Sequence, residues 1–435
     1  MGTDSRGLEL STDDPAIIAG VDTFVESFIS YGVTAGAILE AAKAAPEQVL
    51  VNAKAAALQL FMQTGDSVAN AAPYLARAEA NLSHALPREK LWYELVRAWS
   101  DDDIPAAIAI AEETVRLFPA DIAAMKLGQV HQFHIGDHPA MLRLAETARS
   151  GCEGSPYFHG MLAFALEENN RLAEAEAAAR HAIAMQRAEP WAHHAVAHVM
   201  EAQGRVREGA SFMAEHSDTW AGCNSFMLTH NWWHLALFAI DSDDPGRALA
   251  LFDEHVWGVW KEYSQDQVNA VSLLARLEFV GLDVGARWQD VAQYLAGRLH
   301  EHVEPFLDLH YLLGLVRAGR EASATELLGS MAEHARARAG KPGGDTWREV
   351  ALPLGRGILA YGDENWADAF RQLGQGLPRC QEIGGSHAQR DLFHWLWLEA
   401  GYRAGALEAI RPDLQARVAA RPDVLRHRRE LARIS

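Results

Sequence analysis

Small and apolar residues recur along this chain with helical spacing, and the pattern itself repeats about every 34 residues. Repeats begin near Arg88, Asp121, Pro156, Pro190 and Thr229, so that successive starts lie 33, 35, 34 and 39 residues apart. Alternation of the kind that predicts β-strands is almost absent, and short Gly, Asp and Asn turns separate the helical segments. The sequence therefore predicts an all-α protein built from repeated helical hairpins.

The period and the positions of the small residues fit the tetratricopeptide unit, a 34-residue helical hairpin with small or apolar residues at positions 7, 8, 11, 20 and 27. For the unit that starts at Pro156, the matching residues are Leu162, Ala163, Leu166, Ala175 and Ala182, with a turn at Asn170. Further units start near Val51, Gln267, Pro305, Arg348 and Asp391. We expect a tetratricopeptide-like solenoid of about ten hairpins, curved around an inner groove or pocket.

The spacing of the repeats changes along the chain. After residue 229 the intervals widen, and longer loops appear, such as the segment RARAGKPGGD at 336–345. We expect an N-terminal helical cap at residues 1–50, tetratricopeptide-like repeats at 51–262, and more divergent repeats at 263–435 that close the superhelix. These parts would form one continuous solenoid.

Charge and composition exclude several partners. There are 58 Asp and Glu against 39 Lys and Arg, a formal net charge of −19, which repels a phosphate backbone and argues against nucleic-acid binding. The N-terminal residues carry no apolar leader, no run approaches eighteen apolar residues, and the three cysteines form no CxxC motif. We expect a cytoplasmic protein that does not associate with membranes.

Histidine is unusually frequent, with 20 residues in 435, and four of them form two pairs at helical spacing. His194 and His198 are four residues apart, as are His230 and His234, so each pair shares one helix face. In the repeat template both pairs lie on successive first helices at similar heights. Trp232 would then fill the core, and Trp233 would face the inner groove beside the histidines.

Three interpretations of these four histidines are open. They could bind a divalent transition metal, because neutral imidazole suits Zn, Fe, Ni or Cu. They could form a metal-free acid–base pocket, since histidine titrates near neutral pH. They could also be core histidines that hydrogen-bond between neighbouring helices.

Other polar residues fall at comparable positions of later repeats. Asp266 and Arg276 lie on one predicted helix, where Arg276 either needs a buried partner or faces solvent. Asp308 and His310 form an acidic–imidazole pair, although Asp308 could equally be a helix cap. Ser386, Arg390 and Asp391 lie in the segment GGSHAQRD, where a helix N-terminus could bind an anion or could simply be capped.

The segments AHHAVAHVMEAQGRVREGASFM, HNWWHLALF, AVSLLARLE, VGARWQDV and GGSHAQRD together resemble the tetratricopeptide repeat protein 38 family, in the same order and over nearly the whole chain. The family's HNxWHxAL motif falls on His230, Asn231, Trp233 and His234. The resemblance implies a cytosolic helical-repeat protein and carries no reaction with it. His387 departs from the Asn that the family pattern would place there.

The sequence is compatible with two functions. The first is an enzyme or specific binder for a small polar organic molecule, with acid–base or hydrolytic chemistry. Its catalytic candidates are His194, His198, His230, His234, Asp266, Asp308, His310 and Arg390, and its substrate-binding candidates are Trp191, Asn231, Trp233, Arg276, Ser386 and Asp391. The same four histidines would hold a metal, if there is one. The alternative is a protein-interaction scaffold that binds a peptide in its groove.

Overall fold

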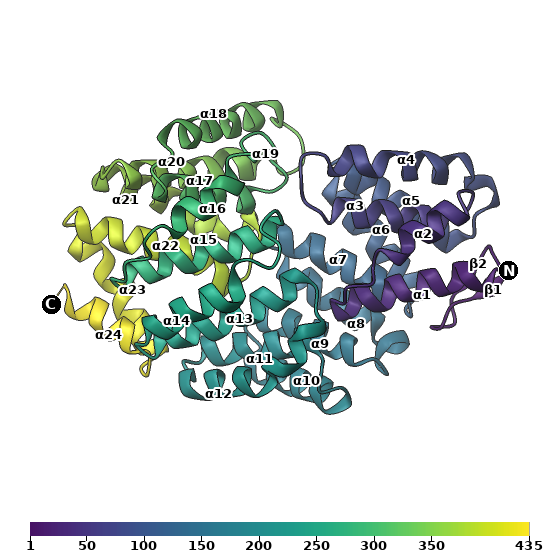
Figure 1. The fold of residues 1–435 in the computed structure, drawn as a ribbon, viewed down its shortest axis with the longest axis horizontal. Helices are drawn as coiled ribbons and strands as arrows, with labels where there is room; N and C mark the ends of the chain where they lie inside the picture. Colours follow the sequence, from purple (N-terminus) through teal and green to yellow (C-terminus); the bar gives the residue numbers. More distant parts are fainter. Residues whose placement is uncertain (435) are drawn as a thin grey trace. The chain divides into compact units, whose positions relative to one another are not determined.

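The computed structural model describes residues 1–434, and within them helices and short loops make up nearly all of the chain. The strands found there are β1 (Gly2–Thr3) and β2 (Glu9–Leu10), which pair antiparallel at the N-terminus. Figure 1 shows the succession of helices. The prediction of an all-α, tetratricopeptide-like hairpin repeat is confirmed.

The chain divides into two compact units, which we describe separately. The first comprises residues 1–195 and 222–224, and the second comprises residues 196–221 and 225–435. The parts predicted from the sequence, with boundaries after residues 50 and 262, stay a prediction.

In the first unit, helical hairpins follow one another along the chain, and the two helices of each hairpin pack together (Figure 1). Its helices are α1 (Pro15–Ser30), α2 (Ala37–Ala44), α3 (Val49–Leu60), α4 (Ser67–Ala80), η1 (Leu82–His84), α5 (Pro87–Ser100), α6 (Ile104–Leu117), α7 (Ile122–His134), α8 (His138–Cys152), α9 (Pro156–Glu168), α10 (Leu172–Met185) and the first part of α11 (Pro190–Ala202). Fully buried alanines such as Ala107, Ala111 and Ala179 let neighbouring helices approach closely. Aspartates 103, 121 and 137 cap the starts of α6, α7 and α8.

The second unit continues the hairpin pattern from the end of α11. Its elements are α12 (Val206–His216), η2 (Ser217–Gly222), α13 (Ser225–Asp241), α14 (Pro245–Leu251), η3 (Phe252–Val256), α15 (Ser264–Phe279), α16 (Arg287–Leu295), α17 (Pro305–Arg317), α18 (Glu321–Ala337), α19 (Gly344–Thr346), η4 (Trp347–Ala351), α20 (Leu352–Gly362), α21 (Trp366–Gly376), η5 (Leu377–Ile383), α22 (His387–Arg403), α23 (Leu407–Ala420) and α24 (Leu425–Ala432). The helices α13, α15, α17 and α20 pack one against the next.

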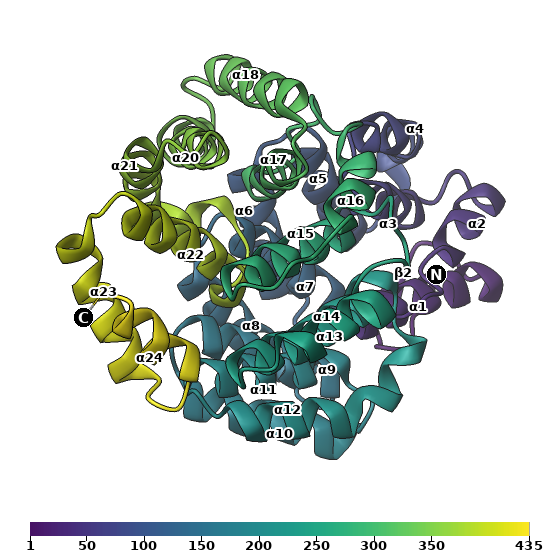
Figure 2. The same cartoon turned by 60° about the vertical axis from the view of Figure 1, so that its left-hand side comes forward.

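The C-terminal helices of this unit return to its beginning. Helix α22 packs on α15, and α24 packs on α13, more than 180 residues earlier in the sequence (Figure 2). A buried ion pair joins Arg426 of α24 to Asp241 at the end of α13, at 3.3 Å. The second unit therefore closes on itself, and the side chains of α13, α15 and α22 become its interior.

The starts of several helices match the sequence prediction and others shift by a few residues. Helices begin at Pro156, Pro190 and Pro305 as expected, because proline is favoured in the first helical turn. Helix α13 begins at Ser225 and α22 at His387, each four residues before the start predicted from the repeat template. Among residues 1–434, no helix combines the length and the apolarity that crossing a bilayer requires.

Candidate functional site

Three of the four predicted histidines meet in the interior of the second unit. His198 lies on α11, and His230 and His234 lie one helical turn apart on α13; none is more than 2% exposed. The ring centroid of His234 lies 4.7 Å from that of His198 and 4.8 Å from that of His230. Each ring offers one nitrogen, and these nitrogens lie within 4.8 Å of one another. We call these three residues the histidine cluster.

A chain of hydrogen bonds from α15 orients His230. The Nδ1 of His230 lies 2.9 Å from Asn269 Oδ1, and because an amide oxygen only accepts, Nδ1 carries the proton. Asn269 Nδ2 donates to Thr229 Oγ1 at 3.1 Å, and that hydroxyl donates to Asp266 Oδ1 at 3.2 Å. The tautomer of His230 is thereby set, and its Nε2 presents a lone pair.

Asp266 anchors this chain of hydrogen bonds. It also accepts from the Ser225 hydroxyl and from the Trp260 backbone N–H. Burial raises the pKa of Asp266 to about 6, although these three donors oppose the shift. Because Asp266 lies on α15 and accepts from Ser225 and Thr229 of α13, it holds the two helices of the cluster together.

A carboxylate stands beside the cluster on α11. The Glu201 carboxylate oxygen lies 3.7 Å from His234 Nδ1, and burial raises the pKa of Glu201 to about 7. Burial also lowers the pKa of His230 to about 3 and that of His234 well below its ordinary value. At neutral pH these two imidazoles are therefore uncharged.

Trp233 and Arg276 pack next to the histidines. The Trp233 indole is fully buried and stacks on His230, with ring centroids 5.2 Å apart and planes only 9° from parallel. The guanidinium of Arg276 lies 5.4 Å from the Trp233 ring centre. Trp232 is only half-buried and stacks on His255 at 3.8 Å. Trp233 therefore lies beside His230, as predicted, whereas Trp232, which was predicted to fill the core, is only half-buried.

Arg276 is buried, which resolves the alternative left open by the sequence. It is 2% exposed and donates to the backbone carbonyls of Ser272 at 3.3 Å and Ala388 at 2.5 Å. Burial lowers the pKa of this guanidinium to about 10, so it stays charged at neutral pH. Its partners come from α15 and α22, so Arg276 fastens the closing helix of the unit beside the cluster.

His194 and Trp191 belong to the first unit. There the His194 ring stacks on Trp191, with centroids 4.3 Å apart, and lies 5.3 Å from Phe164. Trp191 also stacks on Tyr31, the residue that follows α1, at 5.1 Å. Asn231 is fully buried on α13 in the second unit.

The expected pair of Asp308 and His310 does not form. His310 Nδ1 donates to the Phe306 carbonyl at 2.8 Å within α17, and burial lowers its pKa to about 4. Asp308 instead accepts from His302 Nδ1 at 2.6 Å. Residues two apart point to different sides of a helix, so Asp308 and His310 cannot face one site. The sequence reasoning missed His302, although its spacing to Asp308 across a loop was visible.

The predicted anion site at residues 384–391 is a capped helix start. Ser386 and Gln389 form a capping box, in which each side chain bonds the other's backbone N–H. The Arg390 guanidinium donates to the Gly385 carbonyl. Asp391 accepts from Arg417 at 2.7 Å and from the Trp395 indole at 2.6 Å, and the basic side chains around it hold its pKa well below the usual range. These groups stabilise α22, and the capping alternative is the one observed.

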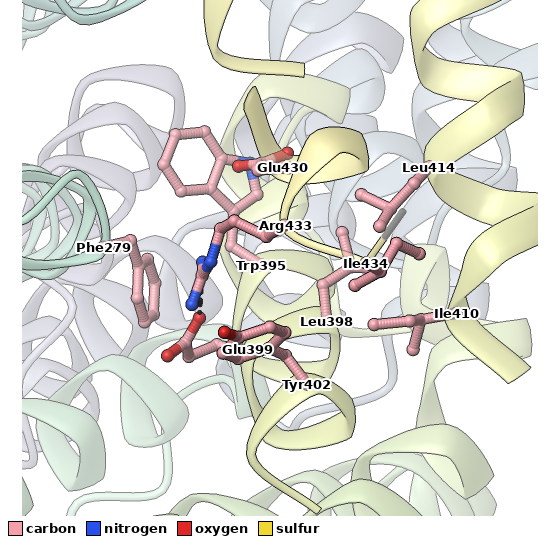
Figure 3. A pocket seen from close by; sticks show the side chains of 10 residues that line it. All are labelled: Phe279, Trp395, Leu398, Glu399, Tyr402, Ile410, Leu414, Glu430, Arg433 and Ile434. Atoms are coloured by element: carbon pink, nitrogen blue, oxygen red, sulfur yellow. Dashed lines mark hydrogen bonds and ion pairs between the residues drawn. The ribbon is translucent and has the colours of Figure 1, made fainter. Parts of the chain in front are cut away.

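A further hollow lies near the C-terminus of the second unit (Figure 3). Aromatic and aliphatic side chains line it, together with Glu399, Glu430 and Arg433. Figure 3 shows Arg433 directed at Glu399, and the ion pair between them measures 3.1 Å. The sequence reasoning missed this hollow because α15, α22 and α24 supply its walls from distant parts of the chain.

No protein-family model matches this chain. Among solved structures, the human IFIT1 dimer with m7Gppp-AAAA aligns over 98% of this chain and 89% of its own, with 13% identity and a TM-score of 0.39. The Naa15/Naa10 complex bound to HypK-THB aligns over 80% and 60% of the two chains, with 11% identity and a TM-score of 0.26. The P58(IPK) TPR domain aligns over 80% and 97%, with 13% identity and a TM-score of 0.24. At these scores the likenesses carry no argument about what this chain binds.

Proposed function

We propose that the second unit binds a divalent transition-metal ion in the histidine cluster, and that the ion holds a small polar organic molecule for hydrolytic chemistry. The observation that carries the proposal is the convergence of His198, His230 and His234, which each present a ring nitrogen within 4.8 Å of the others while fully buried. Three imidazole nitrogens favour Zn, Fe, Ni or Cu over Mg or Ca, which prefer oxygen.

The surroundings of the cluster support this reading. Metal-binding histidines usually donate their second ring N–H to an oxygen that fixes the ring, as His230 does to Asn269. Glu201 places a carboxylate 3.7 Å from His234 Nδ1. The ion would supply a Lewis acid, while Trp233 and Arg276 form one wall of the site.

The metal content of the full chain tests the proposal. We expect about one equivalent of zinc or cobalt per chain after dialysis, measured by inductively coupled plasma mass spectrometry, and a visible d–d absorption band with cobalt(II). His198→Ala, His230→Ala and His234→Ala should each lower the bound metal at least tenfold. His255→Ala is the matched control, because His255 is a half-buried histidine of the same unit that stacks on Trp232.

Folding of the variants is checked by the protection of buried Cys380 from a thiol reagent. If a cluster variant binds as much metal as the wild type, the proposal is wrong. If the alanine variants lose Cys380 protection, His198→Gln and His234→Gln repeat the measurement with side chains that still hydrogen-bond.

A protein-interaction scaffold is the second candidate, and the repeat architecture by itself favours it. The specific observation is an exposed apolar set on two loops of the second unit: Val259 is 50% exposed, Trp260 42% and Val303 37%. Arg298 ties these loops together by donating to the Glu262 carbonyl. Peptides selected from a display library on the full chain should bind Trp260→Ala at least tenfold more weakly and His234→Ala equally well. Peptides that bind both variants like the wild type would exclude this surface.

The narrower family and the compartment belong to the same proposal. The motifs around His230 and Ser386 support membership of the tetratricopeptide repeat protein 38 family. That resemblance implies a cytosolic protein, where a reducing environment suits the free cysteines.

A further inference from the structure

Polar side chains gather at a second place in the second unit, away from the histidine cluster in the sequence. On α18, Glu326, Ser330 and His334 follow one another at intervals of four residues, so they share one face. The loop at 296–304 brings His300 and His302 against this face. Asp308 approaches from the first turn of α17.

Two short hydrogen bonds connect the Ser330 hydroxyl to the Asp308 carboxylate through the imidazole of His302. Ser330 Oγ lies 2.6 Å from His302 Nε2, and His302 Nδ1 lies 2.6 Å from Asp308 Oδ2. With Nδ1–H donated to the carboxylate, Nε2 holds a lone pair and accepts the Ser330 O–H. A nucleophile, a base within hydrogen-bond reach and a third group that orients the base are the parts of a serine–histidine–aspartate triad.

The arrangement is held by the fold. The backbone of His302 is left-handed, with φ of 47°, a conformation that non-glycine residues adopt at a cost. Its side chain is 7% exposed, packs 5.0 Å from the ring of His334 and lies 5.9 Å from Trp347. The Asp308 side chain is 1% exposed. The imidazole is therefore fixed between the hydroxyl and the carboxylate.

Ser330 itself remains accessible. It is half-buried, and a side chain added at the neighbouring Gly329 would meet no atom within 4 Å. His300, 64% exposed, lies with Nδ1 2.8 Å from Ser330 Oγ and with Nε2 2.9 Å from Glu326 Oε1. His300 therefore links Ser330 to Glu326 on the exposed side of the site.

We infer that Ser330 is the nucleophile of an acyl-transfer site for small, uncharged carboxylic esters, and that this site is independent of the proposed metal site. Ser330 Oγ forms a bond to the ester carbonyl carbon while its proton passes to His302 Nε2. The tetrahedral adduct collapses, the bond to the alkoxy oxygen breaks, and His302 returns the proton to that oxygen. Water then attacks the acyl-Ser330 with His302 as base, giving the carboxylic acid and the free serine.

The charge of the substrate follows from the surroundings of the site. The site opens to solvent beside Glu326, and the chain carries a net charge of −19, which disfavours anionic substrates. Asp308 touches no reacting atom, so it is a positioning residue for His302.

A fluorophosphonate probe and p-nitrophenyl acetate test the inference on the full chain. Tandem mass spectrometry should place the phosphonate on Ser330, with at least tenfold lower labelling of Ser323, a serine two turns earlier on the same helix. Ser330→Ala should abolish labelling, and His302→Gln should lower p-nitrophenyl acetate hydrolysis at least a hundredfold. Asp308→Asn should lower the rate and shift the pH–rate profile, whereas a merely structural role would leave the profile unmoved. Equal labelling of Ser323 and Ser330, or hydrolysis that Ser330→Ala leaves unchanged, overturns the inference.

Replacing Ser330 with cysteine provides a second measurement. It tests the inference even if Ser330→Ala does not fold. Ser330→Cys should react with iodoacetamide at pH 6.5 at least tenfold faster than Ser323→Cys, because His302 takes the thiol proton. His302→Gln in the Ser330→Cys background should remove that advantage. If Ser330→Cys and Ser323→Cys react at the same rate, His302 does not activate residue 330 and the inference is wrong.

Discussion

The Lys54 ammonium of the first unit is buried without an oxygen partner, and its removal should stabilise that unit. Lys54 lies on α3 and is 0% exposed, and among residues 1–434 its Nζ finds no hydrogen-bond acceptor. The ammonium lies 3.5 Å from the centre of the Trp92 ring and 5.5 Å from that of Phe24. Burial lowers the pKa of Lys54 from 10.5 to about 7. We predict that Lys54→Met, which keeps the length of the side chain, raises the free energy of unfolding at pH 6.

The magnitude follows from the shift in pKa. A change from 10.5 to about 7 corresponds to about 5 kcal/mol at 1.36 kcal/mol per unit. Loss of the cation–π contact with Trp92 removes up to about 2 kcal/mol, which leaves about 3 kcal/mol of net stabilisation at pH 6. Between pH 7 and 10.5 the unfolded chain holds a proton that the folded chain has released, so wild-type stability rises with pH across this window. The advantage of Lys54→Met should therefore fall to about 1.4 kcal/mol at pH 9.5.

Urea unfolding with a pulse of thiol reagent measures this unit in the intact chain. Cys152 is buried in the first unit and Cys380 in the second, so their labelling reports each unit separately. With a urea dependence of about 2 kcal/mol per molar, the Cys152 midpoint should rise by about 1.5 M at pH 6 and by about 0.7 M at pH 9.5. Lys43→Met is the control, because Lys43 is exposed on α2, and it should leave the midpoint unchanged. A fall in the Cys152 midpoint at pH 6, or a rise that does not shrink at pH 9.5, would refute the reasoning.

Three further predictions concern the second unit, and Cys380 labelling in urea reports on each. Gly209→Ala would place a Cβ 2.3 Å from the Phe238 ring, so we expect the free energy of unfolding to fall by about 1–3 kcal/mol. An unchanged urea midpoint would mean that α12 and α13 can move apart without cost. Arg276→Met removes the hydrogen bonds that the guanidinium donates to carbonyl oxygens of α15 and α22, and we expect a loss of about 3–5 kcal/mol. A gain in stability would show that the cost of burying the charge exceeds the value of these bonds. Ser386→Ala removes half of the capping box with Gln389 and should cost about 1 kcal/mol, while Ser386→Gly should cost less; equal losses would contradict a capping role.

The helical repeat was predictable because its signal is local. Alanines at fixed intervals and prolines at the first helical turn place α9, α11 and α17 at their observed starts. The starts of α13 and α22 were less predictable, since Ser225 and the capping residue Ser386 extend these helices beyond the repeat template. Helix ends depend on such individual hydrogen bonds, which periodicity does not record.

The candidate sites were predictable only in part. The pair His230 and His234 shares a face because helical geometry requires it, and His198 joins them inside the second unit. The hydrogen bond by which Asn269 orients His230 could not be predicted from the sequence, because 39 residues separate the two. The same is true of Ser330 and His302, which a loop brings together across 28 residues.

The sequence by itself determined the all-α repeat and the presence of closely spaced histidines, because both arise from interactions between residues a few positions apart. Only the tertiary structure decided which polar groups are buried together. Helix α22 packs on α15, which encloses Arg276, and the loop at 296–304 folds onto α18, which turns His302 toward Asp308 and Ser330. Such contacts depend on how distant helices pack, and that packing is set by the fit of whole apolar faces rather than by any short motif.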